Sequence, residues 1–262
     1  MNLTTLTSVQ KLQMALHAKA KESPDFRFYS LYDKVYRKDV LMYACERCKA
    51  NGGAAGVDNQ TFEDIEQHGL ERWLDELAQE LKSQTYQPQP VRRVYIPKPD
   101  GKQRPLGIPT IRDRVAQTAA MSVLEPIFEA DLQPEQYAYR ADRSALDAVR
   151  HVHKLINTGH RKIVDADLSS YFDSVPHAEL MRSVARRVVD GAMLHLIRCG
   201  WKLRLRKPMS VEISVGVRAI GMKVEVLHKE LRSAHCSAIC TCAGLCSCGR
   251  SSGTRSVGKR TS

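Results

Sequence analysis

The chain has 262 residues, 43% of them hydrophobic, which is enough to bury the core of one large domain or of two small ones. No stretch approaches the roughly 18 uninterrupted apolar residues of a membrane span, and the N-terminus lacks the charged start and apolar run of a signal peptide. We therefore expect a cytoplasmic protein with no membrane partner.

The formal net charge of +11 suggests a polyanionic partner, but the positive charge is unevenly distributed. From Gly200 onward the chain has 12 Lys/Arg and 3 Glu, whereas the residues before it have 28 Lys/Arg and 26 Asp/Glu. Six of the eight cysteines also lie at or after position 199. This change of composition predicts a boundary near residue 200.

The first part of the chain is predicted to be helical. Apolar residues at helical spacing predict a helix over residues 8–21, with Ser8 as its N-cap. A second helix is expected over residues 31–49, and it ends at the turn Asn51-Gly52-Gly53.

A third helix begins at a capping signal. Thr61 and Asp64 have the Ser/Thr-x-x-Asp/Glu spacing of a capping box. The helix is expected to continue without a break through FEDIEQHGLERWLDELAQEL. Its large apolar residues share one face, as expected of a helix that packs against a core: Leu70, Trp73, Leu77 and Leu81.

A β-hairpin is predicted next. Two extended runs, residues 91–96 and 104–108, flank the turn Pro99-Asp100-Gly101-Lys102. Lys98 and Arg104 lie on opposite arms, where they could present positive charge to one triphosphate, Lys98 as a point charge and Arg104 as a bidentate fork. The same composition is typical of a solvated sheet edge, on which lysine discourages strand pairing, so both interpretations stay open.

The next part of the chain combines helices with a strand. Helices are expected over residues 112–128 and 144–156, a strand over residues 161–168, and a helix from Pro176 to about residue 189. The fold class is therefore mixed α and β, with helices dominant.

The predicted strand ends in carboxylates. Alternation places Ile163, Asp165 and Asp167 on one of its faces. An aspartate at a strand end suits a Mg²⁺ site that faces a cleft, because hard divalent ions bind few carboxylates and keep other positions for water and phosphate. Alternatively, Asp167 and Asp173 cap the following helix, and the spacing does not decide between the two.

Four segments, taken together and in order, resemble a known family. They are "GAAGVDNQTF", "YIPKPDGKQRPLGIPTIRDRVAQ", "EQYAYRADRSALDAV" and "IVDADLSSYFDSVPH". They resemble successive fingers and palm blocks of the reverse transcriptases encoded by group II introns and related bacterial retroelements. The resemblance implies an α+β, helix-rich, right-hand polymerase fold, of which this chain has the fingers and the start of the palm.

The resemblance also implies roles for particular residues. Asp167 would be the first catalytic Mg²⁺ ligand, and Phe172 would lie under the deoxyribose and exclude a 2′-hydroxyl. Lys98 and Arg104 would hold the triphosphate of the dNTP. The partners would be an RNA template or intron RNA and a DNA primer, and the residues expected to contact nucleic acid are Arg112, Arg114, Arg140, Arg143 and Ser144.

The third segment departs from the common form of the family, G-F-R-P-G-R-S. Ala138, Tyr139, Ala141 and Asp142 stand where that form has Gly, Phe, Pro and Gly.

The resemblance and the composition together divide the chain into four parts. We expect an N-terminal helical segment (1–35), the reverse transcriptase fingers (36–160), the first part of the palm (161–199) and a disordered C-terminal tail (200–262). The family's Tyr-x-Asp-Asp hairpin, which supplies the other metal ligands, does not occur in the sequence, and no Asp follows Asp190. We therefore expect no polymerase activity from this chain alone.

The tail has a specific interpretation. Read in a shifted frame with suitable synonymous codons, it permits QGAPISPLLSNLYMRRFVLVWKKLG, which resembles what the family has between its first palm block and its Tyr-x-Asp-Asp hairpin. We therefore interpret residues 200–262 as a frameshifted tail. The alternative is a zinc site, but the tail cysteines lack paired C-x₂-C spacing, so no designed zinc site is expected. Cys45 and Cys48 have no partner pair and are expected to be partly buried thiols.

A different class of function remains as an alternative. The fingers could grip intron RNA through phosphate contacts without polymerising. The residues that would do so are Arg92, Arg93, Lys98, Arg104, Arg112, Arg114, Arg140 and Arg143. A third interpretation is an unfolded product with no function.

Overall fold

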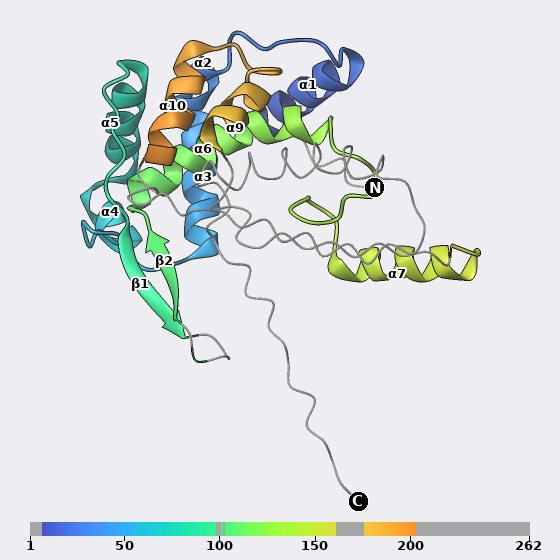
Figure 1. The fold of residues 1–262 in the computed structure, drawn as a ribbon. Helices are drawn as coiled ribbons and strands as arrows, with labels where there is room; N and C mark the ends of the chain where they lie inside the picture. Colours follow the sequence, from blue (N-terminus) through green and yellow to red (C-terminus); the bar gives the residue numbers. More distant parts are fainter. Residues whose placement is uncertain (1–6, 98–100, 102, 161–175, 203–262) are drawn as a thin grey trace, which may run out of the picture.

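The computed structural model describes residues 7–97, 101, 103–160 and 176–202, which form a helix-rich structure with a two-stranded sheet (Figure 1). This agrees with the expected helix-rich α+β class and is compatible with the fingers and palm of a reverse transcriptase. The helices are α1 Ser8–Glu22, α2 Tyr32–Val35, α3 Lys38–Asn51, α4 Phe62–His68, α5 Leu70–Lys82, α6 Ile111–Glu129, α7 Ala145–Asn157, α9 His177–Val184 and α10 Gly191–Lys202. The predicted strand 161–168 and the predicted tail, from residue 203 on, lie outside the described residues.

Local sequence sets where several helices begin. Thr61 accepts a hydrogen bond from the backbone N–H of Asp64, and the Asp64 carboxylate accepts one from the Thr61 N–H, so the predicted capping box is confirmed. Ser8 as the cap of α1 was wrong by one residue. Thr7 is the N-cap, and it forms a capping box with Gln10.

Two of the expected helices are interrupted. Residues 31–49 do not form one helix, because α2 ends at Val35 and the backbone is extended at Arg37, the N-cap of α3. The helix expected from residue 62 to residue 81 is broken at Gly69, which has φ +99°, a conformation that glycine adopts readily. Gly69 is therefore both the C-cap of α4 and the N-cap of α5.

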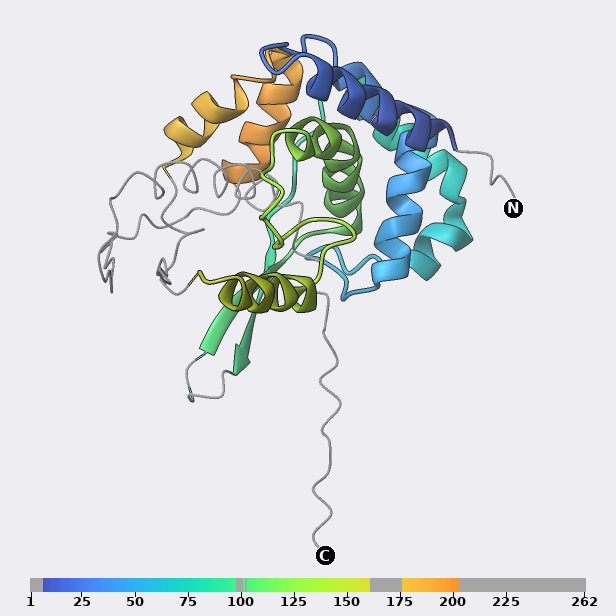
Figure 2. The same ribbon diagram turned by 90° about the vertical axis from the view of Figure 1, so that its right-hand side faces the viewer.

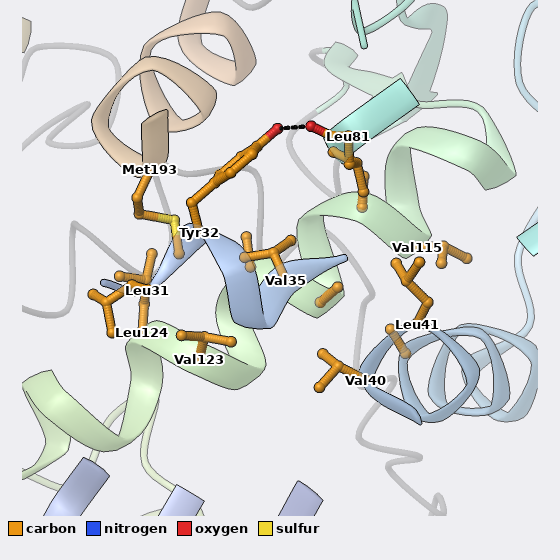
Figure 3. Close-up of a cluster of buried hydrophobic side chains, with 14 of the residues drawn as sticks. Leu31, Tyr32, Val35, Val40, Leu41, Leu81, Val115, Val123, Leu124 and Met193 are labelled. Atoms are coloured by element: carbon orange, nitrogen blue, oxygen red, sulfur yellow. Dashed lines mark hydrogen bonds between the residues drawn. The ribbon is translucent and has the colours of Figure 1, made fainter. Parts of the chain in front are cut away.

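Helix α6 is the centre of the core. Most of its residues are buried, and α1, α2 and α3 pack against it. Figure 3 shows Leu31 and Val35 from the α2 region, Leu41 from α3 and Val123 from α6 in one cluster. At the edge of this cluster the Tyr32 hydroxyl donates to the Leu81 carbonyl over 2.6 Å, and burial raises the pKa of Tyr32 to about 12.

The segment between α9 and α10 joins the N-terminal region. The Arg187 guanidinium is buried; it pairs with Asp131, which follows α6, and donates to the Ala20 carbonyl in α1. The Asp190 carboxylate accepts hydrogen bonds from the backbone N–H groups of two helix starts. They are Leu31 and Tyr32 at α2, over 2.8 Å each, and Ala192 and Met193 at α10, over 3.0 and 3.1 Å.

Helix α7 lies apart from this core (Figure 2). It is amphipathic, yet none of its residues is buried within the described part of the chain. Leu146, Val149 and Val152, all on its apolar side, are 55%, 63% and 50% exposed.

Candidate nucleotide and nucleic-acid interface

The predicted hairpin is confirmed, with each strand starting within one residue of its expected position. Strands β1 (Arg92–Pro97) and β2 (Gln103–Ile108) are antiparallel, and Ile96 is paired with Arg104. Lys98 follows Pro97, the last residue of β1, and lies outside the described residues, as does the side chain of Arg104. The register nevertheless places the Arg104 backbone in β2 opposite Ile96, near the end of the ladder that leads into the turn.

The hairpin exposes both of its faces. Side chains alternate along β1, so Arg93 and Tyr95 share one face and Val94 and Ile96 share the other. Tyr95 is 55% exposed and Ile96 45%. The two strands extend away from the helices of the core around α6 (Figures 1 and 2).

A buried carboxylate lies at the root of the hairpin. Asp113, in the first turn of α6, is 1% exposed. One of its oxygens accepts from the Tyr86 hydroxyl over 2.7 Å. The other accepts from the Gln89 backbone N–H over 3.1 Å and from the Thr110 hydroxyl over 2.8 Å. Burial raises the pKa of Asp113, whereas these three hydrogen bonds act to lower it.

The glycine-rich loop before α4 packs against the same place. A Cβ on Gly56 would lie 2.6 Å from the Thr110 Cα, so the loop backbone approaches the end of the hairpin closely only because position 56 has no side chain. Arg114 donates to the carbonyls of Gly52 and Ala54 over 3.1 and 3.0 Å, and its guanidinium lies 5.9 Å from the Phe62 ring centroid. Arg114 therefore holds this loop in place.

Two more of the arginines expected to contact nucleic acid have partners inside the protein. Arg112 pairs with Glu80 over 2.6 Å and lies over the Trp73 ring. Arg140 binds Glu129 through two nitrogens and donates to backbone carbonyls of the following loop. These contacts assign Arg112 and Arg140 structural roles, and a contact of either with nucleic acid stays a prediction.

The remaining two candidates lie at the start of α7. The Arg143 guanidinium lies 5.5 Å from the Tyr137 ring centroid. Ser144 is the N-cap of α7, and it forms a capping box with Asp147. In the loop before them Tyr139 and Asp142 have φ values of 59° and 58°, a left-handed conformation that costs energy for residues other than glycine.

The expected metal ligand, Asp167, and the expected deoxyribose contact, Phe172, lie outside the described residues. Within the described part, no group of three His, Cys, Asp or Glu side chains is arranged to hold a metal ion. Cys45 and Cys48 are buried and in no disulfide, more buried than expected, and burial raises the pKa of Cys45 to about 11. No helix among the described residues is long and apolar enough to cross a membrane.

The buried hydrogen bonds of Asp113 at the root of the hairpin were not predicted from the sequence. A signal for the bond with Thr110 was available, because Thr110 and Asp113 repeat the Ser/Thr-x-x-Asp spacing that was recognised at Thr61. That spacing predicts a helix that begins at Ile111, as α6 does, one residue earlier than expected. The hydrogen bonds to Tyr86 and Gln89 have no local sequence signal, since both residues precede the hairpin.

Comparison with known proteins identifies the class. The family "Reverse transcriptase (RNA-dependent DNA polymerase)" matches residues 96–218. Protein YkfC of Escherichia coli K12 is 39% identical over 202 residues, which cover 74% of this chain and 51% of YkfC. The group II intron-encoded protein LtrA of Lactococcus lactis is 32% identical over 181 residues, covering 68% of this chain and 29% of LtrA. The putative COX1/OXI3 intron 1 protein of Saccharomyces cerevisiae is 27% identical over 159 residues, covering 61% of this chain and 19% of that protein.

The chain is thus related by sequence to reverse transcriptases. Its relatives place it in the group II intron reverse transcriptase family, to which it belongs. The chain spans about half the length of YkfC and less than a third of LtrA. The matched region extends to residue 218, so the comparison does not mark the boundary expected near residue 200.

Proposed function

We propose that this chain supplies the nucleotide-binding fingers, and the first palm strand, of a group II intron-type reverse transcriptase. Residues 36–160 would form the fingers and residues 161–199 the start of the palm, preceded by the helical segment 1–35. The ligands would be a dNTP, an RNA template or intron RNA, and a DNA primer.

The register of the hairpin is the observation that best supports this proposal. Strands β1 and β2 pair so that the Arg104 backbone lies opposite Ile96, one pair from the end of the ladder, and Lys98 follows β1 directly in the sequence. An ammonium and a guanidinium on opposite arms suit a triphosphate, which offers several anionic oxygens to a point charge and to a planar fork.

The number of available carboxylates limits what can be proposed for Mg²⁺. Mg²⁺ is the family's expected ion, and Asp167 is the carboxylate that would bind it. Phosphoryl transfer by two metals needs several carboxylates, and the described residues hold no group of three candidate ligands. The family's Tyr-x-Asp-Asp hairpin, which would supply the other carboxylates, does not occur in the sequence, so the proposal includes no polymerase activity for the chain alone.

The C-terminal part would be the product of a change of reading frame near residues 198–200. The support is the concentration of Lys, Arg and Cys after that point and the family-like segment that the shifted frame permits. Sequencing the gene through this region tests it. Codons incompatible with QGAPISPLLSNLYMRRF in the shifted frame would refute it and leave the fingers proposal standing.

Equilibrium binding of a dNTP with Mg²⁺ to the full chain tests the nucleotide site. We expect Lys98→Ala and Arg104→Ala each to raise the Kd about tenfold or more, because each removes a charged contact with the triphosphate. Lys11→Ala is the matched control, since it removes the same charge from an exposed position on α1. Equal affinities in all four proteins, or no binding by the unmodified chain, would refute the site.

The alternative is a fragment that grips intron RNA without binding nucleotides. The internal partners of Arg112, Arg114 and Arg140 count against it, because these side chains are already committed to the protein. RNA binding that weakens steeply with salt, combined with no affinity for dNTP, would favour this alternative.

A further inference from the structure

The β1–β2 hairpin has little support except at its root. Within the described residues the substantial contacts of β1 and β2 are with each other, and neither strand packs broadly on a helix. Both faces of β1 are exposed. An isolated two-stranded hairpin is marginally stable in water, so its orientation must be set where it joins the helices.

The two ends of the hairpin meet at one carboxylate. Gln89 lies three residues before β1, and Thr110 lies two residues after β2. The Gln89 N–H and the Thr110 hydroxyl donate to the same oxygen of Asp113, over 3.1 and 2.8 Å. The Tyr86 hydroxyl donates to the other oxygen and so connects the segment that follows α5 to Asp113. Asp113 therefore connects the entrance and the exit of the hairpin to α6.

We propose that Asp113 is a positioning residue that fixes the orientation of the β1–β2 hairpin and thereby the place where its turn meets the nucleotide. The consequence for the nucleotide rests on the function proposed above; the anchoring of the hairpin does not. Asp113 acts through the hairpin and touches no ligand itself.

The length of the hairpin makes its root important. Six residues at about 3.3 Å each make a strand about 20 Å long. A rotation of about 5° at the root would therefore move the turn by about 2 Å, by simple geometry on that length. A displacement of about 1 Å at a binding group can cost a large factor in activity. A rigid root is thus required if side chains near the turn are to act on a triphosphate.

The burial of Asp113 and of the two side chains that donate to it favours a fixed geometry. Asp113 and Thr110 are 1% and 0% exposed, and Tyr86 is 9% exposed. Water has little access to replace a lost hydrogen bond, so removing one donor leaves a carboxylate oxygen poorly satisfied. The close approach of Gly56 to Thr110 ties the glycine-rich loop to the same point.

Hydrogen exchange, followed by mass spectrometry on the full chain, tests the anchoring. Tyr86→Phe removes only one hydroxyl, and Thr110→Val removes the hydroxyl that also caps α6. We expect amide exchange in residues 91–108 to become at least tenfold faster in both variants, while exchange within α3 stays unchanged. Thr110→Ser keeps the hydroxyl and should exchange as the unmodified protein does.

Asp190→Asn is the matched control. It replaces another carboxylate that accepts hydrogen bonds at helix starts, but those helices are α2 and α10. It should leave exchange in the hairpin unchanged. Unchanged hairpin exchange in Tyr86→Phe and Thr110→Val would overturn the proposal. Equal acceleration in the hairpin and in α3 would also overturn it, because Asp113 would then serve general stability only.

The Kd for a dNTP with Mg²⁺, measured on the same variants, separates this inference from the proposed function. We expect about a tenfold increase in Kd for Tyr86→Phe and Thr110→Val, and recovery with Thr110→Ser. Faster hairpin exchange with an unchanged Kd would overturn the positioning role. Faster hairpin exchange in a chain that binds no dNTP at all would refute the nucleotide site and leave the anchoring by Asp113 intact.

Discussion

Asp142 has a backbone conformation that favours glycine. Its φ of 58° is left-handed, and the common family form has glycine at this position. Glycine adopts this conformation without the steric cost that a Cβ brings, although aspartate tolerates it better than most residues. The aspartate that stands at position 142 in place of the family's glycine therefore strains the backbone there.

We predict that Asp142→Gly stabilises the protein by about 0.5–1 kcal/mol, because it removes backbone strain at a positive φ. Asp142→Ala should destabilise it, since alanine keeps the Cβ and lacks the polar side chain that tolerates this conformation. The measurement is urea unfolding followed by circular dichroism. Equal stability of the Gly and Ala variants would show that the backbone at 142 is not under strain.

The internal partners of the arginines were not predicted from the sequence. A cluster of arginines near family motifs suggests phosphate contacts, yet Arg114 binds two carbonyls of the glycine-rich loop and Arg140 pairs with Glu129. Arg187, which was not singled out, is buried and joins α1 to the end of α6. Sequence alone does not separate these roles, because the acceptors are distant in the chain or are backbone carbonyls.

At the scale of elements, local signals were predicted well and tertiary ones were not. The capping box at Thr61 and the Pro-Asp-Gly turn depend on neighbouring residues, so the start of α4 and the hairpin were predictable. The break at Gly69 was not, because an isolated glycine within a helical pattern is often tolerated. Helix α7 has a clear apolar stripe, but periodicity does not say what covers it.

Asp190 joins two elements, and this gives a prediction that depends on pH. Its burial acts to raise the pKa, but four backbone N–H groups outweigh this and hold the pKa of the carboxyl below its usual range. The stabilisation is therefore present above the unfolded value of about 4 and is lost as pH falls through the lower folded value.

We expect Asp190→Asn to destabilise the protein by about 1–3 kcal/mol at pH 7, because an amide cannot accept all four hydrogen bonds. The difference should shrink as the pH falls below about 4, because the carboxylate of the unfolded state is protonated there first and the native carboxylate only at lower pH. Chemical unfolding at several pH values measures both effects. A difference that stays constant from pH 7 to pH 3.5 would show that the charge of Asp190 contributes nothing.

At the scale of the whole molecule, the sequence identified the family because four motifs occur in the family's order. The described helices and hairpin agree with the helix-rich class and its small sheet. The division into fingers and palm remains a prediction, as do Asp167 and Phe172, which lie outside the described residues. Their positions depend on how the palm strand packs, and local sequence does not specify that packing.

The central claim is that the chain binds a nucleotide through its hairpin but does not polymerise by itself. The most direct test is single-nucleotide incorporation by the purified full chain, with an RNA template, a DNA primer, Mg²⁺ and one labelled dNTP. We predict no extended primer above the level of Asp167→Ala, because one carboxylate cannot replace the several that two-metal phosphoryl transfer requires. Incorporation by the unmodified chain that Asp167→Ala abolishes would contradict the account.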